Sequence, residues 1–426
     1  MPQIINNKDG VSLLKANLKN KAIKYMVEDQ FIKKLLSKLK KDIDKKIGYI
    51  TRNIIFRNDK IQNNKILMLT QQGDFTCNEK FITLELLKEN AECEIVWAVR
   101  KEQLTKAYEI PNNSRIKLVL RFSYEFYSDL STAKVIIINS VDPYKRPLKK
   151  KRGQVVLQTW HGSLGIKRFD KNSFNGREWV QAAIRCGKET DYCISNSAFE
   201  DDVYRNTYWG KTPILRFGHA RNDIFFWPSK NKELVIQNII NLYKLDSNTH
   251  YILYGPTFRD NHQFDCYCID YDRLIDACQK KFGGKWNILV RFHLNVRRFS
   301  AHALKSNKNV IDVTDYPDIQ ELMLIADIAI TDYSSWIYDF ILLKRPGFIF
   351  ATDISSYNNE RGFYYKLEST PFLIATNNDE LVQNISTFDL NTYLQKLNRF
   401  LDEKKCVDDG LASKRVVDFI KRIINI

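Results

Sequence analysis

The stretch from Val155 to Asp170 brings together the residue types that phosphate chemistry needs. It reads VVLQTWHGSLGIKRFD, so an apolar run leads into His161, and two glycines and two cations follow. Glycine lets the backbone approach a ligand closely, and the unpaired N–H groups at a helix start attract anions. We therefore predict a strand, then a tight turn that opens a helix carrying Lys167 and Arg168. A histidine next to a glycine is often only structural, so a catalytic role for His161 needs support from the rest of the chain.

Further polar clusters follow apolar runs in the second half of the chain. Residues 251–254 lead into Gly-Pro-Thr-Phe-Arg-Asp, residues 288–290 into Arg-Phe-His, and residues 328–330 into Thr-Asp-Tyr-Ser-Ser. In a doubly wound sheet, ligands bind at the carboxyl ends of the strands, where these clusters fall. Serines at a helix start suit phosphate, and a carboxylate one turn later suits ribose hydroxyl groups. The candidate side chains are Thr257, Arg291, His293, Ser334, Ser335 and Asp339.

Alternating strands and helices must position these residues, and they predict an α/β fold with parallel sheets. A helix is expected at 78–89, and a closing helix at 414–424 that packs back across the first lobe. Pro228 and Ser229 interrupt the pattern, so we place a domain boundary there, between two Rossmann-like lobes at 61–228 and 229–426. The predicted strands are 65–70, 94–99, 116–120, 134–139, 155–158, 191–196 and 214–217 in the first lobe, and 251–254, 287–291, 310–312, 328–331 and 347–350 in the second.

Length and composition are those of a globular chain. The 426 residues are 44% hydrophobic, and at about 150 residues per domain they predict two or three compact units. No apolar run approaches the roughly 18 residues of a membrane span, so we expect a soluble or peripheral protein. The eight cysteines are scattered and do not form pairs at zinc-ligand spacing, which favours reduced thiols in a cytoplasm.

The net charge of +16 predicts an anionic partner, which could be a membrane, a nucleic acid or a substrate. Residues 1–60 include a basic amphipathic pattern, in which apolar residues recur at helical spacing among many lysines, most clearly from Ile32 to Ile50. Such a helix can lie at an anionic membrane surface. It can equally pack on its own protein with a solvated lysine face, and the sequence leaves both possibilities open.

The polar clusters also resemble those of a known family. Trp160-His161-Gly162, Gly218 to Asp223, Gly255 to Asp260, Arg291 to His293 and Thr331 to Ser335 occur in the order and approximate spacing of the CDP-glycerol glycerophosphotransferases, the teichoic acid primases and polymerases. The resemblance extends roughly from residue 65 to residue 400. It implies a GT-B fold with the donor in a cleft between two lobes, and a monotopic membrane enzyme at the cytoplasmic face.

By the same resemblance, the active-site histidines are His161 and His293. Transfer of a polyol phosphate needs a base for the attacking hydroxyl and stabilisation of phosphoryl charge, so we assign His161 as the base and His293 to the phosphate. The chain has Ser-Leu-Gly-Ile-Lys after His161 where many members have Thr-Pro followed by Leu-Lys, which leaves the phosphate contacts of this turn and the identity of the polyol open. The implied donor contacts are Gly162, Ser163, Leu164, Gly165, Arg221, Pro256, Thr257, Arg291, Phe292, Ser334, Ser335 and Asp339.

The expected substrates are CDP-glycerol or CDP-ribitol and a lipid-linked or polymeric glycan or polyol-phosphate acceptor, in synthesis of a teichoic-acid-like or capsular polymer. No cofactor is required by this chemistry, and no compact ligand cluster indicates a metal. A GT-B glycosyltransferase using a nucleotide sugar is the alternative within enzymes. A nucleic-acid-binding protein would explain the charge, but the sequence contains no recognised nucleic-acid module and the histidine motifs would have no purpose, so we do not expect a nucleic-acid partner.

Overall fold

The computed structural model describes residues 54–89, 91–104, 110–141, 150–165, 167–170, 176–257, 268–292, 307–354 and 362–425. The chain divides into two compact units, Met1–Asp59 and Lys60–Ile426. Most of the predicted basic helical segment, residues 1–60, lies outside the described residues. His293 also lies outside them. The fold described below is that of the second unit.

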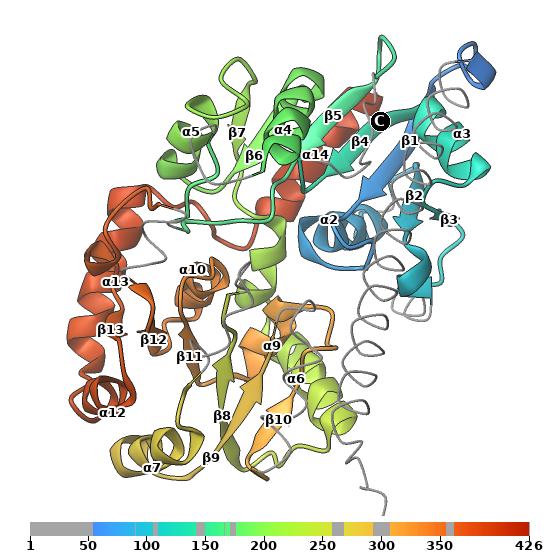
Figure 1. Cartoon of the computed structure of the whole chain (residues 1–426). Coiled ribbons are helices and arrows are strands. Elements are labelled where there is room, and N and C mark those ends of the chain that lie inside the picture. The colour runs from blue at the N-terminus through green and yellow to red at the C-terminus, as the bar shows by residue number, and fades with distance from the viewer. Residues whose placement is uncertain are drawn as a thin grey trace, which may run out of the picture. The chain divides into compact units, whose positions relative to one another are not determined.

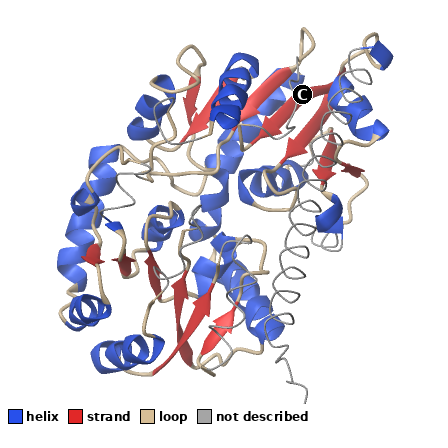
Figure 2. Ribbon diagram, viewed as in Figure 1, coloured by secondary structure: helices blue, strands red, loops and turns tan. Residues whose placement is uncertain are grey.

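The second unit contains two parallel sheets, which confirms the predicted α/β class (Figures 1 and 2). The first sheet has the strand order β3-β2-β1-β4-β5-β6-β7. Its central strands are continuous apolar runs because helices cover both faces of a parallel sheet. Its strands are β1 Gln62–Leu69, β2 Glu94–Val99, β3 Ile116–Leu120, β4 Ala133–Ile138, β5 Val155–Gln158, β6 Tyr192–Ser195 and β7 Ile214–Arg216.

The second sheet has the strand order β10-β9-β8-β11-β12-β13. Its buried strands pair in parallel throughout, as in the first sheet. Strand β13 was not predicted, because three residues with two half-buried side chains give little hydrophobic signal. The strands are β8 Thr249–Tyr254, β9 Lys285–Val290, β10 Val310–Asp312, β11 Ile328–Thr331, β12 Gly347–Phe350 and β13 Leu373–Ala375.

Short polar residues begin many of the helices. Ser123, Ser197, Asp270 and Asp318 each accept a hydrogen bond from a backbone N–H of the helix that they precede, which satisfies one of its free donors. The helices are α2 Cys77–Lys88, α3 Tyr124–Thr132, α4 Arg177–Glu189, α5 Ala198–Arg205, α6 Ser229–Tyr243, α7 Tyr271–Phe282, α9 Ile319–Ile325, α10 Trp336–Phe340, α12 Asn378–Ser386, α13 Leu390–Lys404 and α14 Ala412–Ile424, with a 3₁₀ segment η3 at Ala220–Phe226.

The segment after His161 is not the helix that we predicted. Residues 161–165 and 167–170 have no helical structure, and Lys167 instead forms an antiparallel bridge with Phe363 of the second lobe. The backbone N–H of Arg168 also donates to the carbonyl of Gly362, at 3.1 Å. Two glycines weaken the helix, and pairing with the other lobe satisfies the backbone in its place. The expected anion site at a helix start is therefore absent from this part of the described chain.

Helix α14 packs on the first lobe, as predicted, although it follows the whole second lobe in the sequence (Figure 1). Asp223 of η3 accepts the backbone N–H groups of Ala412 and Ser413, at 3.0 and 2.7 Å, and so caps the start of α14. Burial raises the pKa of Asp223 to about 6, although these hydrogen bonds oppose the shift. Pro228 precedes α6 between the last strand of one sheet and the first of the other, and we keep it as the proposed boundary.

Candidate active site

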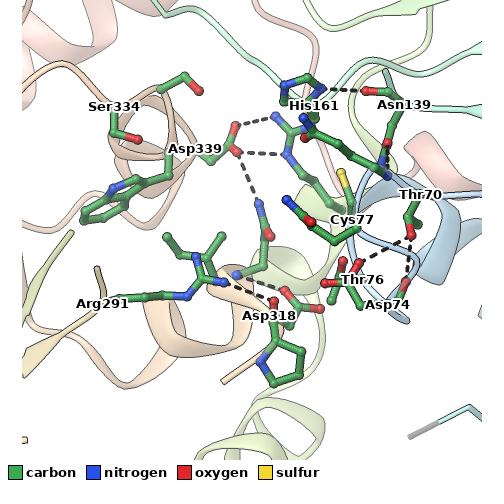
Figure 3. A pocket seen from close by; sticks show the side chains of 18 residues that line it. Thr70, Asp74, Thr76, Cys77, Asn139, His161, Arg291, Asp318, Ser334 and Asp339 are labelled. Carbon is green, nitrogen blue, oxygen red and sulfur yellow. Dashed lines mark hydrogen bonds and ion pairs between the residues drawn. The ribbon is translucent and has the colours of Figure 1, made fainter. Parts of the chain in front are cut away.

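A polar cavity of about 270 Å³ lies where the carboxyl ends of the two sheets face each other. Figure 3 shows Ser334 and Asp339 on the opposite side of this cavity from Thr70 and Asp74. Loops that follow β1, β4 and β5 line it from the first lobe, and loops that follow β9 and β11 line it from the second. The cavity therefore stands at the edge where the fold predicts a ligand.

His161 faces this cavity with a defined tautomer. Its Nδ1 lies 2.6 Å from the backbone carbonyl oxygen of Asn139. Because a carbonyl can only accept, Nδ1 carries the proton, and the neutral ring keeps its lone pair on Nε2. Desolvation inside the cleft and the nearby Arg221 charge lower the pKa of His161, although the Asn139 contact opposes the shift. His161 is thus held as a neutral base.

A buried carboxyl group supports the residue that orients His161. The side-chain amide of Asn139 donates to Glu79 at 2.9 Å, and the Thr159 hydroxyl donates to the same carboxyl at 2.8 Å. Burial raises the pKa of Glu79 to about 7, against the effect of these hydrogen bonds. Sequence reasoning missed Glu79 and Asn139, because they lie 82 and 22 residues before His161 and no local pattern connects them.

The residues before and after His161 are fixed by contacts from several elements. Trp160 has a φ of +53°, which is unusual for a bulky side chain and costs on the order of 1–3 kcal/mol, so its surroundings must impose it. Arg221 donates to the carbonyl of Gly162, and the Tyr365 hydroxyl donates to that of Leu164. A Cβ on Gly165 would lie 2.7 Å from that of Ser335, so glycine allows the two lobes to meet here.

Arg221 and Asp339 form a buried ion pair between the lobes, with each side chain only 3% exposed. Arg221 Nε donates to Asp339 at 2.9 Å, and the amides of Asn222 and Gln320 donate to the same carboxylate at 3.1 and 3.2 Å. Burial is the largest single effect and lowers the pKa of Arg221, but the opposing effects, chiefly the charge and the hydrogen bonds of Asp339, together outweigh it and the net shift is upward. We expected both residues to contact the donor, but the structure pairs them with each other, and direct donor contacts remain a prediction.

A second basic group lines the cavity. The Arg291 guanidinium donates to the carbonyls of Tyr316 and Pro317, at 3.2–3.4 Å. Desolvation lowers its pKa, while the charges of Asp318 and Asp74 oppose that shift. Burial in turn raises the pKa of Asp74. A phosphate group entering beside Arg291 would meet a cation that is already held in place by backbone oxygens.

A larger cavity of about 550 Å³ adjoins the polar cavity. The two share Gln71, His161, Ser334 and Ser335, so the histidine borders both. Lys167 reaches from it to the Thr257 hydroxyl, at 3.1 Å. Its remaining lining is aromatic, basic and small: Trp160, Phe169, Trp179, Tyr333, Arg100, Arg168, Ser140, Val141, Gly162, Ser163 and Gly165.

The structure brings most of the predicted site residues to these two cavities. Pro256 is buried after β8, and the Thr257 backbone N–H donates to Asp332 at 2.8 Å. Phe292 is only 7% exposed and its backbone N–H donates to Thr314, so its side chain belongs to the core. Within the described residues, there is no group of three or more His, Cys, Asp or Glu side chains that could hold a metal ion.

Two parallel-sheet lobes with a cavity between them define a GT-B-like fold. The model of the CDP-glycerol:poly(glycerophosphate) glycerophosphotransferase family matches residues 51–422. The chain therefore belongs to this family, as its sequence motifs predicted.

Individual relatives agree with this assignment. The chain is 27% identical to a teichoic acid poly(glycerol phosphate) polymerase of Bacillus spizizenii, over 84% of this chain and 92% of that one. It is 33% identical to a polymerase of the same name from Staphylococcus epidermidis, over 72% of this chain but only 44% of the longer relative. The wall teichoic acid polymerase TagF, solved as a histidine variant after a soak with CDPG, is 28% identical with a TM-score of 0.77, over 92% of this chain and 98% of that one. Similar proteins also include a poly(ribitol-phosphate) polymerase.

The raised pKa of Glu79 predicts a pH-dependent effect on stability. An acid that binds its proton more tightly in the native state than in the unfolded chain loses native-state stability as pH rises from about 4.5 to about 7. Glu79→Gln removes this titration, so its melting temperature relative to wild type should rise between pH 5 and pH 8. Thermal unfolding across this range measures the difference. Glu85→Gln on the same helix is the matched control, and a Glu79→Gln difference that does not vary with pH would contradict the assignment.

Proposed function

We propose that this chain transfers glycerol phosphate, or a related polyol phosphate, from a CDP-linked donor to a hydroxyl group of a glycan or polyol-phosphate acceptor. The acceptor oxygen attacks the distal phosphorus, a new P–O bond forms, and the bond to CMP breaks. The hydroxyl proton goes to Nε2 of His161. The observation that carries the proposal is the 2.6 Å contact from Nδ1 of His161 to the Asn139 carbonyl, because it leaves Nε2 free to accept that proton inside the cleft.

The proposed donor site extends along both sides of His161. We assign phosphate contacts to the loop Gly162–Gly165, to Ser334 and Ser335, and to His293, which lies outside the described residues. Arg221 and Arg291 supply positive charge next to the phosphorus, and Asp339 holds Arg221 in place. Pro256 and Thr257 are assigned to the nucleotide end of the donor, next to Lys167. Such a reaction needs little covalent chemistry from the protein beyond the base, so positioning and charge stabilisation provide most of the acceleration.

We propose that the chain works at the cytoplasmic face of the membrane, on a lipid-linked or polymeric acceptor. Among the described helices, none is long and apolar enough to cross a membrane. The net charge of +16 and the lysine-rich pattern within residues 1–60 favour attachment to an anionic surface. The product would be a teichoic-acid-like or capsular polymer.

A donor screen tests the proposed function. The purified protein is incubated with an acceptor and with CDP-glycerol, CDP-ribitol or nucleotide sugars, with and without EDTA, and the released nucleotide is identified. Release of CMP from a CDP-polyol, with the polyol phosphate recovered on the acceptor, is expected. Release of UDP or UMP from nucleotide sugars alone would establish the glycosyltransferase alternative instead.

Replacing His161 should separate chemistry from binding. In His161→Ala, CDP-glycerol binding should stay within a few-fold of wild type, while transfer should fall by roughly 10²–10⁴, the usual contribution of a positioned base. Equilibrium binding and initial rates of CMP release measure the two quantities. His250→Ala is the matched control, because His250 is exposed at the amino end of β8, the sheet edge opposite the site.

The pH profile adds a second test of His161. Its pKa is lowered, so the activity of wild type should decline only below the usual histidine range, as the ring becomes protonated. That acid limb should be absent from the residual activity of His161→Ala but present in Glu79→Gln. If the acid limb is instead lost in Glu79→Gln and kept in His161→Ala, the titrating group is the buried carboxyl group of Glu79.

Removal of residues 1–57 should release the protein from anionic liposomes, because this segment carries the basic amphipathic pattern. Sedimentation with vesicles measures the bound fraction. High salt should weaken binding of the full chain, and zwitterionic vesicles serve as the control. Equal binding before and after truncation would place the attachment on another basic face.

A further inference from the structure

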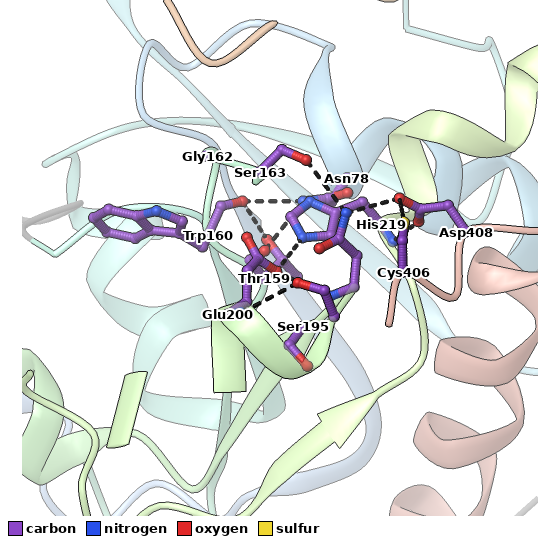
Figure 4. Close-up of polar contacts among 12 residues, drawn as sticks. Asn78, Thr159, Trp160, Gly162, Ser163, Ser195, Glu200, His219, Cys406 and Asp408 are labelled. Carbon is purple, nitrogen blue, oxygen red and sulfur yellow. Dashed lines mark hydrogen bonds and ion pairs between the residues drawn. The ribbon is translucent and has the colours of Figure 1, made fainter. Parts of the chain in front are cut away.

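A closed ring of hydrogen bonds connects the segment before α14 to the loop that carries His161. Figure 4 shows three of its members, Asp408, Ser163 and Gly162. Starting from Asp408, the ring runs through the Asn196 amide to Ser163, and through the adjacent peptide to the Gly162 carbonyl. Arg221 donates to that carbonyl and also to Asp339. Asn222 donates to both Asp339 and Asp408 and so completes the ring. The members are Asp408, Asn196, Ser163, Gly162, Arg221, Asp339 and Asn222.

Asp408 is bound by three N–H donors that come from separate parts of the first lobe. The backbone N–H of His219 donates at 2.7 Å, and the amides of Asn196 and Asn222 donate at 2.8 and 3.2 Å. The Cys406 thiol donates to Asp408 as well, at 3.7 Å. An acceptor whose partners are all donors is a carboxylate, and its charge strengthens each bond. Desolvation raises the pKa of Asp408, while the hydrogen bonds oppose the shift. Asp408 thus provides a charged anchor at a position 212 residues from Asn196 in the sequence.

Asn196 connects Asp408 to the candidate active site through hydrogen bonds. Its amide nitrogen donates to Asp408 and, at 3.2 Å, to the hydroxyl oxygen of Ser163. Its backbone N–H donates to Glu200, which also lies 2.7 Å from His219 Nε2, so the backbone of Asn196 is fixed as well. Because the Ser163 oxygen accepts from Asn196, its own O–H must point elsewhere, and Ser163 lines the larger cavity two residues after His161.

We propose that Asp408 is a positioning residue for the phosphate-transfer reaction, acting through Asn196 on Ser163 and on the backbone next to His161. This inference rests on the proposed function, since it takes the His161 loop as the place of catalysis. Without Asp408, the Asn196 amide loses its charged partner, and the Ser163 hydroxyl loses the donor that fixes its direction. A displacement of about 1 Å at a reacting group can cost on the order of 10² in rate.

A role limited to stability makes a different prediction. Asp408 also holds the segment that leads into α14, so its loss could simply loosen the packing of that helix. In that case, the melting temperature would fall while the folded fraction kept the wild-type kcat. If Asp408 has a positioning role, its substitution lowers the kcat of the fully folded enzyme. The substitution has this effect only while Asn196 is present, because Asn196 connects Asp408 to the His161 loop.

The test is a double-mutant cycle of Asp408→Asn and Asn196→Ala, in full-length protein whose folded fraction is measured. Each single variant should lower kcat for CMP release from CDP-glycerol by roughly 10- to 100-fold, with donor affinity within a few-fold of wild type. The double variant should be no more than about threefold slower than the slower single variant, because both changes break one path. Asp409→Asn, which removes the neighbouring exposed carboxylate paired with Arg415, is the matched control and should keep the wild-type kcat.

The outcomes separate this inference from the proposed function. Suppose that the wild type transfers polyol phosphate. If Asp408→Asn then keeps the wild-type kcat, or if the effects of the two substitutions multiply in the double variant, the positioning role is wrong and the proposed function stands. A wild type that releases no CMP from any CDP-polyol overturns the proposed function. If Asp408→Asn does not fold, a cycle of Asn196→Ala and Ser163→Ala replaces it, and multiplying effects there would also reject the path.

Discussion

The buried ion pair of Arg221 and Asp339 is the interaction on which the closed arrangement of the two lobes depends. Arg221 belongs to η3 of the first lobe and Asp339 to α10 of the second, and both are almost fully enclosed. Removing one partner of such a pair typically costs about 3–5 kcal/mol, because the other charge is left without compensation. Separation of the lobes would leave both charges unpaired unless water reached them. The pair therefore ties lobe closure to the position of the Gly162 carbonyl, which Arg221 also binds.

Around this pair, the site combines the neutral imidazole of His161 with cations that other groups of the protein already hold in place. Asp339 balances Arg221, and Lys80 of α2 makes a second bridge between the lobes to Asp318 and Glu321, at 2.7 and 2.5 Å. Such balanced charges are fixed before a substrate arrives, so little reorganisation is needed when negative charge develops on a phosphoryl group. Fixed dipoles and a base with a fixed tautomer are the properties that a phosphate-transfer site requires.

The sequence predicted most of the fold but only part of what surrounds His161. Strands such as β4 and β11 were found because a buried parallel strand is a continuous apolar run. The helix after His161 was predicted wrongly, because the competing partner, Phe363, lies about 200 residues further on. For the same reason, sequence reasoning did not identify Glu79, Asn139 or Asp408 as site residues. Hydrogen bonds between distant segments leave no periodic pattern in the sequence. The individual roles of Arg221 and Asp339 could not be read from their motifs, which specify residue types but not their pairing.

The docking of α14 on the first lobe has a consequence for the order in which the protein is made. A chain emerging from the ribosome folds its earlier segments first, yet the first lobe here is completed by a helix that is synthesised after the whole second lobe. Until α14 emerges, its apolar residues cannot cover the first lobe, and Asp408 cannot reach Asn196. While the second lobe is being synthesised, the apolar surface of the first lobe that α14 will cover therefore stays exposed. The hydrogen bonds that connect Asp408 to the His161 loop can therefore form only after the second lobe has been synthesised.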